Sequence, residues 1–147
     1  MLSTFAAAPD NLSRNPAWDT PEKASRHTAE IKNFLIDERP ITKAAFSCAA
    51  EPAFMSALKK SMKKQVIVIG IETHVCVYQT VADLLAKQYN VHVVADAVSS
   101  RTQKNKDIAI ERMKTEGAVI TSTEMIATEL LRTSAHPKFK EILSLIR

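Results

Sequence analysis

The chain of 147 residues has little glycine, little cysteine and few aromatic residues. Its two glycines, Gly70 and Gly117, are too few for the GxGxxG or GxxxxGK[ST] loops that bind phosphates. Its two cysteines, Cys48 and Cys76, are too few for a disulfide framework and too far apart for a CxxC zinc motif, so we expect no metal and no cofactor. No apolar run approaches the roughly 20 residues that span a bilayer, so no membrane partner is expected.

The charge is also not concentrated in one place. Lys and Arg total 20 against 16 Asp and Glu, a net charge of +4, and aromatic residues make up only 5%. The single basic cluster, residues 59–64, falls at a predicted helix end, where the helix dipole favours cations. These values indicate a globular protein that does not bind nucleic acid. The first residues lack the basic region of a signal peptide, and the sparse cysteine fits a reducing cytoplasm.

The pattern along the chain predicts an α/β protein. Residues 1–22 follow no helical or strand period and are expected to form an irregular arm, followed by one domain over residues 23–147. In that domain strands alternate with helices, which is typical of βαβ units and a parallel sheet covered by helices on both faces. The expected strands are 41–46, 66–71, 91–95 and 118–120; the expected helices are 21–35, 51–64, 75–89, 105–116, 124–132 and 138–146.

Three side chains could carry chemistry near the carboxyl ends of these strands, where ligands bind in such sheets. Cys76 lies five residues past the strand 66–71, in the first turn of the next helix. The helix N-terminus should lower its pKa and favour a nucleophilic thiolate, although a buried structural cysteine fits the same position. Cys48 is more typical of a core or loop thiol. Lys43, inside an apolar segment, could hold an anion or stabilise a thiolate, or protect an edge strand from aggregation.

Polar residues follow the second and third strands. Glu72, Thr73 and His74 lie between the strand and Cys76, where they are candidates for turn, capping or substrate contacts. His74 is not assigned as the general base, because a spacing of two residues does not bring the side chains together. Asp96 and Arg101 flank the next loop: Asp96 could cap it, and Arg101 could face a substrate carboxylate or a partner subunit.

One string is more specific than these patterns. GIETHVCVYQTVADLL, residues 70–85, resembles the isochorismatase-like cysteine hydrolases, in particular the isochorismatase domain-containing subgroup. The resemblance continues through VHVVADAVSSRTQKNKDIAIERMKTEGAVITSTEM to HPKFKEI, and reaches upstream to ITKAAFSC, so that it covers roughly residues 29–147. It implies a three-layer α/β/α sandwich around a parallel, Rossmann-like sheet. It also implies a hydrolase that acts on an amide or related bond of a small molecule.

The resemblance also implies roles for individual residues. Cys76 matches the family's nucleophile and Lys43 its lysine. A cis peptide would join Ile71 to Glu72, and the backbone amides of Glu72 and Cys76 would form an oxyanion hole.

One part of the family's pattern is not found. The family's catalytic Asp lies in an apolar run ending Asp-x-Gln on an N-terminal strand, and neither Asp10 nor Asp19 follows such a run. The resemblance therefore implies a domain shortened at its N-terminus, without the metal-binding residues of the nicotinamidase branch. A sheet that lacks a central strand exposes edges, so we expect the chain to self-associate as a homo-oligomer, to borrow a strand from a partner, or to cover the gap with its N-terminal arm.

Three functions remain open from the sequence. The first is a cysteine hydrolase with Cys76 as nucleophile, whose turnover depends on replacing the Asp. The second is an inactive isochorismatase-like subunit that serves in oligomerisation or interaction. The third is a redox-sensing protein that uses Cys76 and Cys48.

Overall fold

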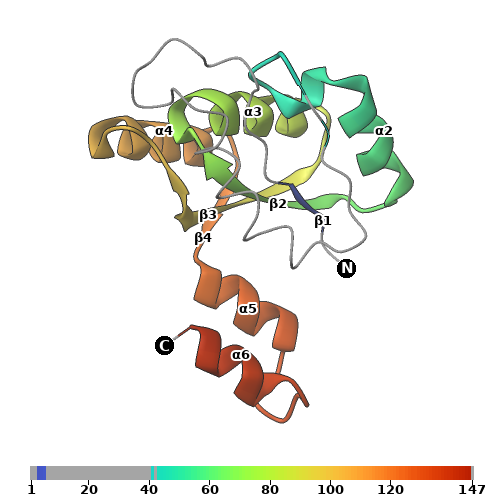
Figure 1. The fold of residues 1–147 in the computed structure, drawn as a ribbon, viewed down its shortest axis with the longest axis vertical. Coiled ribbons are helices and arrows are strands. Elements are labelled where there is room, and N and C mark those ends of the chain that lie inside the picture. Colours follow the sequence, from blue (N-terminus) through green and yellow to red (C-terminus); the bar gives the residue numbers. More distant parts are fainter. Residues whose placement is uncertain (1–2, 6–40, 42, 147) are drawn as a thin grey trace.

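A parallel sheet forms the centre of the molecule (Figure 1). The structure is a computed structural model, and it describes residues 3–5, 41 and 43–146. The four strands follow one another in the order β1-β2-β3-β4, and each pairs in parallel with the next. They are β1 (Ser3–Phe5), β2 (Gln65–Ile71), β3 (Asn90–Ser99) and β4 (Val119–Thr121).

Strand β2 has strands on both sides and helices above it, which explains its sequence. The run Val66, Ile67 and Val68 is buried on both faces instead of alternating, as expected for a strand inside a parallel sheet. Gly70 near its end has a φ of +111°, a conformation that side chains rarely adopt. The register with β3 shifts at this point, between Val68 and Gly70.

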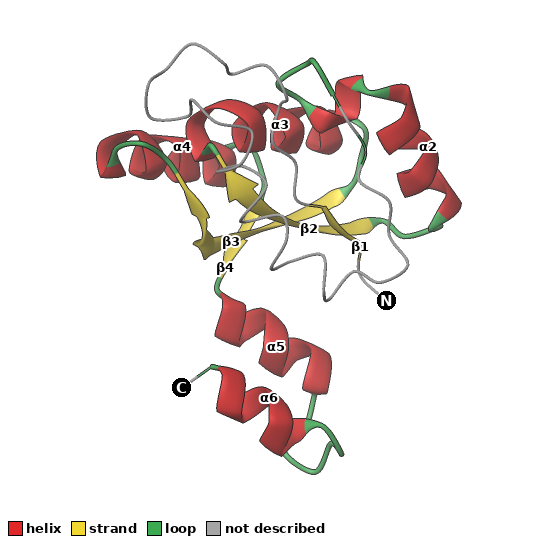
Figure 2. Ribbon diagram, in the orientation of Figure 1, coloured by secondary structure: helices red, strands yellow, loops and turns green. Residues whose placement is uncertain are grey.

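Helices lie on both sides of the sheet (Figure 2). On one side are α2 (Pro52–Lys60), α3 (Tyr78–Ala86) and α4 (Gln103–Thr115). On the other side α5 (Thr123–Leu131) and α6 (Phe139–Leu145) stand away from the sheet. A 3-10 turn, η1 (Cys48–Ala50), precedes α2, and a π-helical turn, η2 (Thr73–Val77), precedes α3. The predicted α/β class with a parallel sheet is confirmed.

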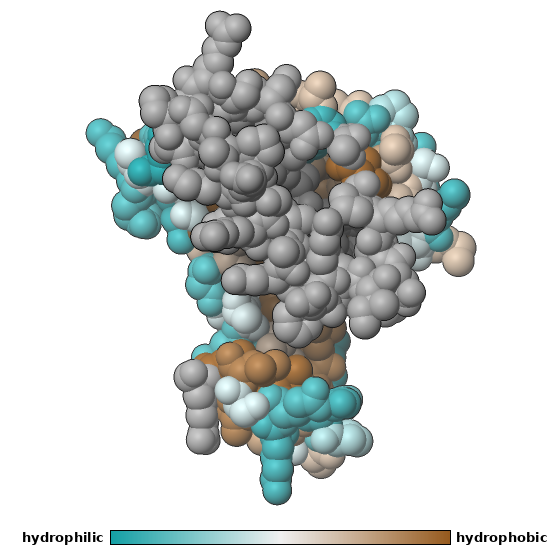
Figure 3. Space-filling view, in the orientation of Figure 1, coloured by the Kyte–Doolittle hydropathy of each residue, from teal (hydrophilic) through white to brown (hydrophobic). Residues whose placement is uncertain are grey.

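The hydrophobic core lies between the sheet and the first group of helices. Leu58 of α2, Leu84 of α3 and Met113 of α4 are each fully buried there, against valines of β2 and β3. By contrast, α6 buries no side chain, and α5 buries only Leu131. Figure 3 shows apolar surface over these two helices. No helix in the described part of the chain is long and apolar enough to cross a membrane.

Two sequence predictions about strands were wrong. Residues 43–50 form bends and η1 instead of a strand, because the chain turns back there around the Lys43 side chain. Ser3–Phe5, expected to be irregular, pairs in parallel with Val66–Val68. Three residues are too few to give a two-residue period, so this strand had no pattern to detect. The expected helix 21–35 lies outside the described residues.

Candidate active site at the end of strand β2

The chain makes a tight turn where β2 ends, and this turn positions Cys76. The peptide bond between Ile71 and Glu72 is cis, as the resemblance implied. The Glu72 carbonyl then accepts hydrogen bonds from the amides of Val75 (3.1 Å) and Val77 (3.2 Å). These bonds wind η2, a turn wider than an α-helical one, directly into α3. Cys76 lies in this turn with 3% of its surface exposed.

The two cysteines, far apart in the sequence, lie together. Both are free thiols, and both line one small cavity of about 20 Å³. The Thr80 hydroxyl joins their backbones, because it accepts from the Cys48 amide (2.9 Å) and donates to the Cys76 carbonyl (2.7 Å). The rest of the cavity lining is largely apolar: Phe54, Val66, Val68, Ile69, Val77 and Leu84. The sequence analysis missed Thr80, although its spacing of four residues places it one helical turn after Cys76.

Lys43 is buried, with only 5% of its surface exposed. Its ammonium donates to the carbonyls of Ala45 and Phe46, both at 2.9 Å, so its own loop wraps around the charge. That charge lowers the pKa of the Cys48 thiol, but the larger effect of burial leaves this pKa above its usual value. Lys43 is therefore not an edge-strand lysine. It is a buried cation whose charge acts on the Cys48 thiol.

A side-chain contact fixes the Lys43 loop on α3. The Ser47 hydroxyl donates to the Asp83 carboxylate and also accepts from the Ala49 amide, where it caps η1. Both residues were missed from the sequence, because their contact spans 36 positions and neither belongs to a local motif. The loop that carries Lys43 is thus tied to the helix that follows Cys76.

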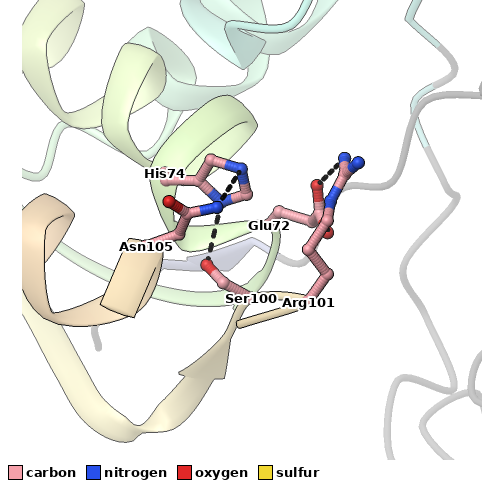
Figure 4. A network of polar contacts seen from close by, with 5 residues as sticks. All are labelled: Glu72, His74, Ser100, Arg101 and Asn105. Atoms are coloured by element: carbon pink, nitrogen blue, oxygen red, sulfur yellow. Dashed lines mark hydrogen bonds and ion pairs between the residues drawn. The ribbon is translucent and has the colours of Figure 1, made fainter. Parts of the chain in front are cut away.

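Glu72 and Arg101 form an ion pair at the carboxyl ends of β2 and β3 (Figure 4). Arg101 Nε and Nη2 donate to the two Glu72 oxygens at 3.1 and 2.7 Å. The Glu72 side chain is 4% exposed and that of Arg101 48%. These hydrogen bonds hold the pKa of the Glu72 carboxyl below its usual value. Arg101 therefore anchors the turn from β3, a role that its sequence position alone did not distinguish from substrate binding.

His74 belongs to a second polar group in the same turn (Figure 4). Its Nδ1 lies 3.0 Å from Ser100 Oγ, and its Nε2 lies 3.5 Å from Asn105 Nδ2. Both ring nitrogens thus have polar neighbours on the loop and helix after β3, which supports leaving His74 without a general-base role. Ser100 and Asn105 carry no recognisable motif, and sequence reasoning missed them.

Of the two remaining candidate residues, Thr73 lies in the turn and Asp96 lies outside it. The Thr73 side chain is fully buried, and its hydroxyl has no hydrogen-bond partner among the described residues. Asp96 lies within β3, which is longer than expected, and accepts from the Thr123 amide (2.9 Å) and hydroxyl (3.1 Å). Asp96 therefore holds the start of α5. In the described part of the chain, no group of three His, Cys, Asp or Glu residues could bind a metal.

Comparison of the chain with known protein families and structures identifies its family. The sequence profile of the Isochorismatase domain matches residues 4–125. Because the match covers most of the chain, the chain belongs to the isochorismatase-like hydrolase family, as the resemblance predicted.

Individual relatives agree with this. The chain is 52% identical over 85 residues to the secreted isochorismatase effector Isc1 of Phytophthora sojae, over 58% of this chain and 40% of that protein. It is 46% identical to the solved MAR1 ribonuclease of Caenorhabditis elegans, with a TM-score of 0.66 over 71% of this chain and 53% of that one. YcaC of Pseudomonas aeruginosa, solved with hexane-2,5-diol and covalent acrylamide, is 28% identical, with a TM-score of 0.74 over 78% of this chain and 58% of that one.

One further likeness shows the fold alone. YcaC of Escherichia coli, an octameric hydrolase of unknown specificity, is 22% identical, with a TM-score of 0.72 over 99% of this chain and 72% of that chain. The chain spans about half the length of the relatives that it matches at higher identity.

Proposed function

We propose that the chain hydrolyses an amide or related bond of a small molecule, with Cys76 as the nucleophile. The observation that carries this proposal is the position of Cys76. It is a free thiol in the turn directly after a buried parallel strand, and it lines a cavity together with Cys48, whose thiol feels the charge of the buried Lys43. Ligands of open α/β sheets bind at this end of the strands.

The proposed reaction has two halves. The Cys76 thiolate attacks the carbonyl carbon, and the amides of Glu72 and Cys76 stabilise the oxyanion. The C–N bond breaks, the amine leaves with a proton taken from a water molecule, and a thioester remains on the sulfur. The hydroxide formed from that water then attacks the thioester, which releases the acid and restores the thiolate. Lys43 contributes a positive charge that favours the anionic forms.

The ionisable side chains of Glu72 and His74, which are close to Cys76 in the sequence, already have polar partners. Glu72 is held by Arg101, and His74 has polar neighbours at both ring nitrogens. We therefore assign the proton transfers to neither. Asp10 and Asp19 lie outside the described residues.

The P. aeruginosa neighbour supports the choice of probe, since it was solved with covalent acrylamide. Acrylamide is an amide and also an acceptor for thiolates, so it tests attack by Cys76 on either of its two electrophilic carbons. The C. elegans neighbour is a ribonuclease by name. A small molecule is proposed here because the basic residues are scattered and aromatic residues are few.

The test is a screen of small primary amides with three proteins: wild type, Cys76→Ala, and Cys48→Ser as the matched control. We expect Cys76→Ala to lower the rate roughly 10³-fold or more, the scale seen when a nucleophile is removed. Cys48→Ser should keep the activity. An unchanged rate in Cys76→Ala would contradict the nucleophile. A wild type that binds but never turns over would favour the inactive-subunit alternative.

We also propose that the partner of this chain is a second copy of itself, in the cytoplasm. Three large hydrophobic side chains of α5 and α6 are exposed: Met125, Leu130 and Leu145. The E. coli neighbour is octameric, which fits assembly of this fold into homo-oligomers. The cytoplasmic location rests on the two free cysteines, and the P. sojae relative is a secreted effector.

A further inference from the structure

Cys48 has no part in the proposed hydrolysis, yet it shares a cavity with the nucleophile. Both thiols are free and buried, at 7% and 3% exposure, and both line the same small space. A volume of about 20 Å³ admits one water-sized molecule. The two sulfurs therefore share one small space, in which a sulfenic acid formed on one cysteine lies next to the other.

The backbone holds the two cysteines in fixed relation. Thr80 accepts from the Cys48 amide and donates to the Cys76 carbonyl, so one hydroxyl ties η1 to η2. The Ser47–Asp83 contact adds a second tie between the Cys48 segment and α3. Cys48 therefore cannot move away from Cys76 without breaking these hydrogen bonds, and buried polar groups are costly to leave unpaired.

We propose that Cys76 and Cys48 form a peroxide-sensitive pair that closes to an intramolecular disulfide and reversibly switches off the site. This goes beyond the proposed hydrolysis and rests on it only in requiring a reactive thiolate at Cys76. The physical consequence is direct, because a Cys76 sulfur bonded to Cys48 is no longer a thiolate and cannot act as the nucleophile on a substrate carbonyl.

The step balances with a peroxide as the oxidant. The Cys76 thiolate attacks one oxygen of hydrogen peroxide, the O–O bond breaks, and Cys76 sulfenic acid and hydroxide form. The Cys48 sulfur then attacks the Cys76 sulfur and loses its proton, and the hydroxyl leaves as water. Two thiols and one peroxide thus give one disulfide and two waters. A dithiol reductant restores both thiols.

The environments of the two sulfurs suit these different roles. Burial holds the pKa of the Cys48 thiol above its usual value, which keeps it protonated and slow to meet the oxidant first. Lys43 lies close enough to oppose this effect. Because Cys48 also lines the same cavity as Cys76, we assign it as the resolving thiol, which reacts once a sulfenic acid has formed beside it.

The experiment treats the full chain with hydrogen peroxide, blocks the remaining thiols, and maps the peptides without reduction. Trypsin separates the cysteines cleanly, since residues 44–59 hold Cys48 and residues 65–87 hold Cys76. We expect a crosslink between these two peptides in the monomer band, lost on treatment with dithiothreitol. In Cys48→Ser we expect no crosslink, and dimedone should instead trap a sulfenic acid on Cys76.

Each other outcome overturns the pair. Equal dimedone labelling of wild type and Cys48→Ser would show that Cys48 does not resolve the sulfenic acid. A crosslink found only between two molecules would place the partner thiol elsewhere. Iodoacetamide labelling of Cys76 in a separate, unoxidised sample distinguishes the two proposals: labelling there without a crosslink in the oxidised sample overturns the switch and leaves the nucleophile standing. Absence of both reactions overturns the two together.

Discussion

The turn after β2 and the helix pair α5–α6 differ in which side chains they bury and which they expose. In the turn and the segments packed around it, polar groups are buried and have specific partners: Glu72 with Arg101, Lys43 with two carbonyls, and Thr80 with the Cys48 amide and the Cys76 carbonyl. In α5 and α6, large apolar side chains are exposed, and the two helices together bury only Leu131. A buried polar group has to be positioned by its partners, whereas an exposed apolar group is free to meet another surface. The first region thus has the features of a catalytic site, and the second has the features of a surface that binds another protein.

Replacing a leucine by alanine should reveal the largest difference in stability between the core helices and the α5–α6 pair. Leu84 of α3 is fully buried, and Leu145 of α6 is 74% exposed. Leu84→Ala should lower the free energy of unfolding by about 2–5 kcal/mol, since it leaves a cavity in the core. Leu145→Ala is the matched control and should change it by less than about 0.5 kcal/mol. Chemical denaturation of both variants checks this, and equal losses would contradict the contrast.

Removing the buried cation should have the next largest effect. Lys43→Met keeps the length of the side chain but leaves the Ala45 and Phe46 carbonyls without their donor. We expect a loss of about 1–3 kcal/mol in stability and slower alkylation of Cys76. Lys59→Met, at an exposed position of α2, should do neither. If Lys43→Met leaves the alkylation rate unchanged, the ammonium does not support the thiolate.

The Glu72–Arg101 pair should make stability depend on pH. The pKa of Glu72 is lowered in the folded state, so its stabilisation is complete above the unfolded carboxyl pKa of about 4.3. It is lost as the pH falls through the lower folded-state pKa. Glu72→Gln should therefore cost about 1–2 kcal/mol at neutral pH, a figure reduced for the exposure of Arg101, and the difference should shrink in acid.

The control for this pH dependence is Glu141→Gln, because the Glu141–Lys138 pair is exposed on both sides. It should cost no more than about 0.5 kcal/mol at any pH. If the Glu72→Gln difference grew as the pH fell, the assignment of a lowered pKa would be wrong.

Substitutions on the exposed surface of α5 and α6 should have the smallest effect on stability, but they should change the oligomeric state. Leu130→Glu with Leu145→Glu places charges where apolar side chains face solvent. We expect native mass spectrometry to show an oligomer for wild type and a smaller species for the double variant. At low protein concentration the stability should change by less than about 1 kcal/mol. A monomeric wild type at high concentration would show that these helices are not an interface between copies.

Much of the domain was predictable from local patterns. The buried run of β2, the helices α3 and α4, and the C′ position of Gly117 all follow from short-range periodicity and turn chemistry. The string around Cys76 was specific enough to predict the family. What local patterns missed were contacts between distant segments, such as Ser47 with Asp83 and Cys48 with Thr80.

The wrong prediction around Lys43 has a physical cause. ITKAAF reads as a strand because its residues are apolar, but a buried ammonium needs acceptors, and the nearest are the carbonyls of its own loop. The chain bends to supply them, so the strand is lost. Asp96 was expected in a loop because the apolar run of the predicted strand ends at residue 95. In the structure β3 continues to Ser99, so Asp96 lies within the strand.

The most direct test of the account is the alkylation of Cys76 by iodoacetamide as a function of pH, with Cys48 as internal control. Peptides 65–87 and 44–59 report the two thiols separately. The account predicts that Cys76 reacts faster than Cys48, and that Cys48 reacts slowly because burial raises the pKa of its thiol. If Cys76 reacts no faster than Cys48, the turn after β2 does not hold a working nucleophile, and the proposed hydrolysis is contradicted.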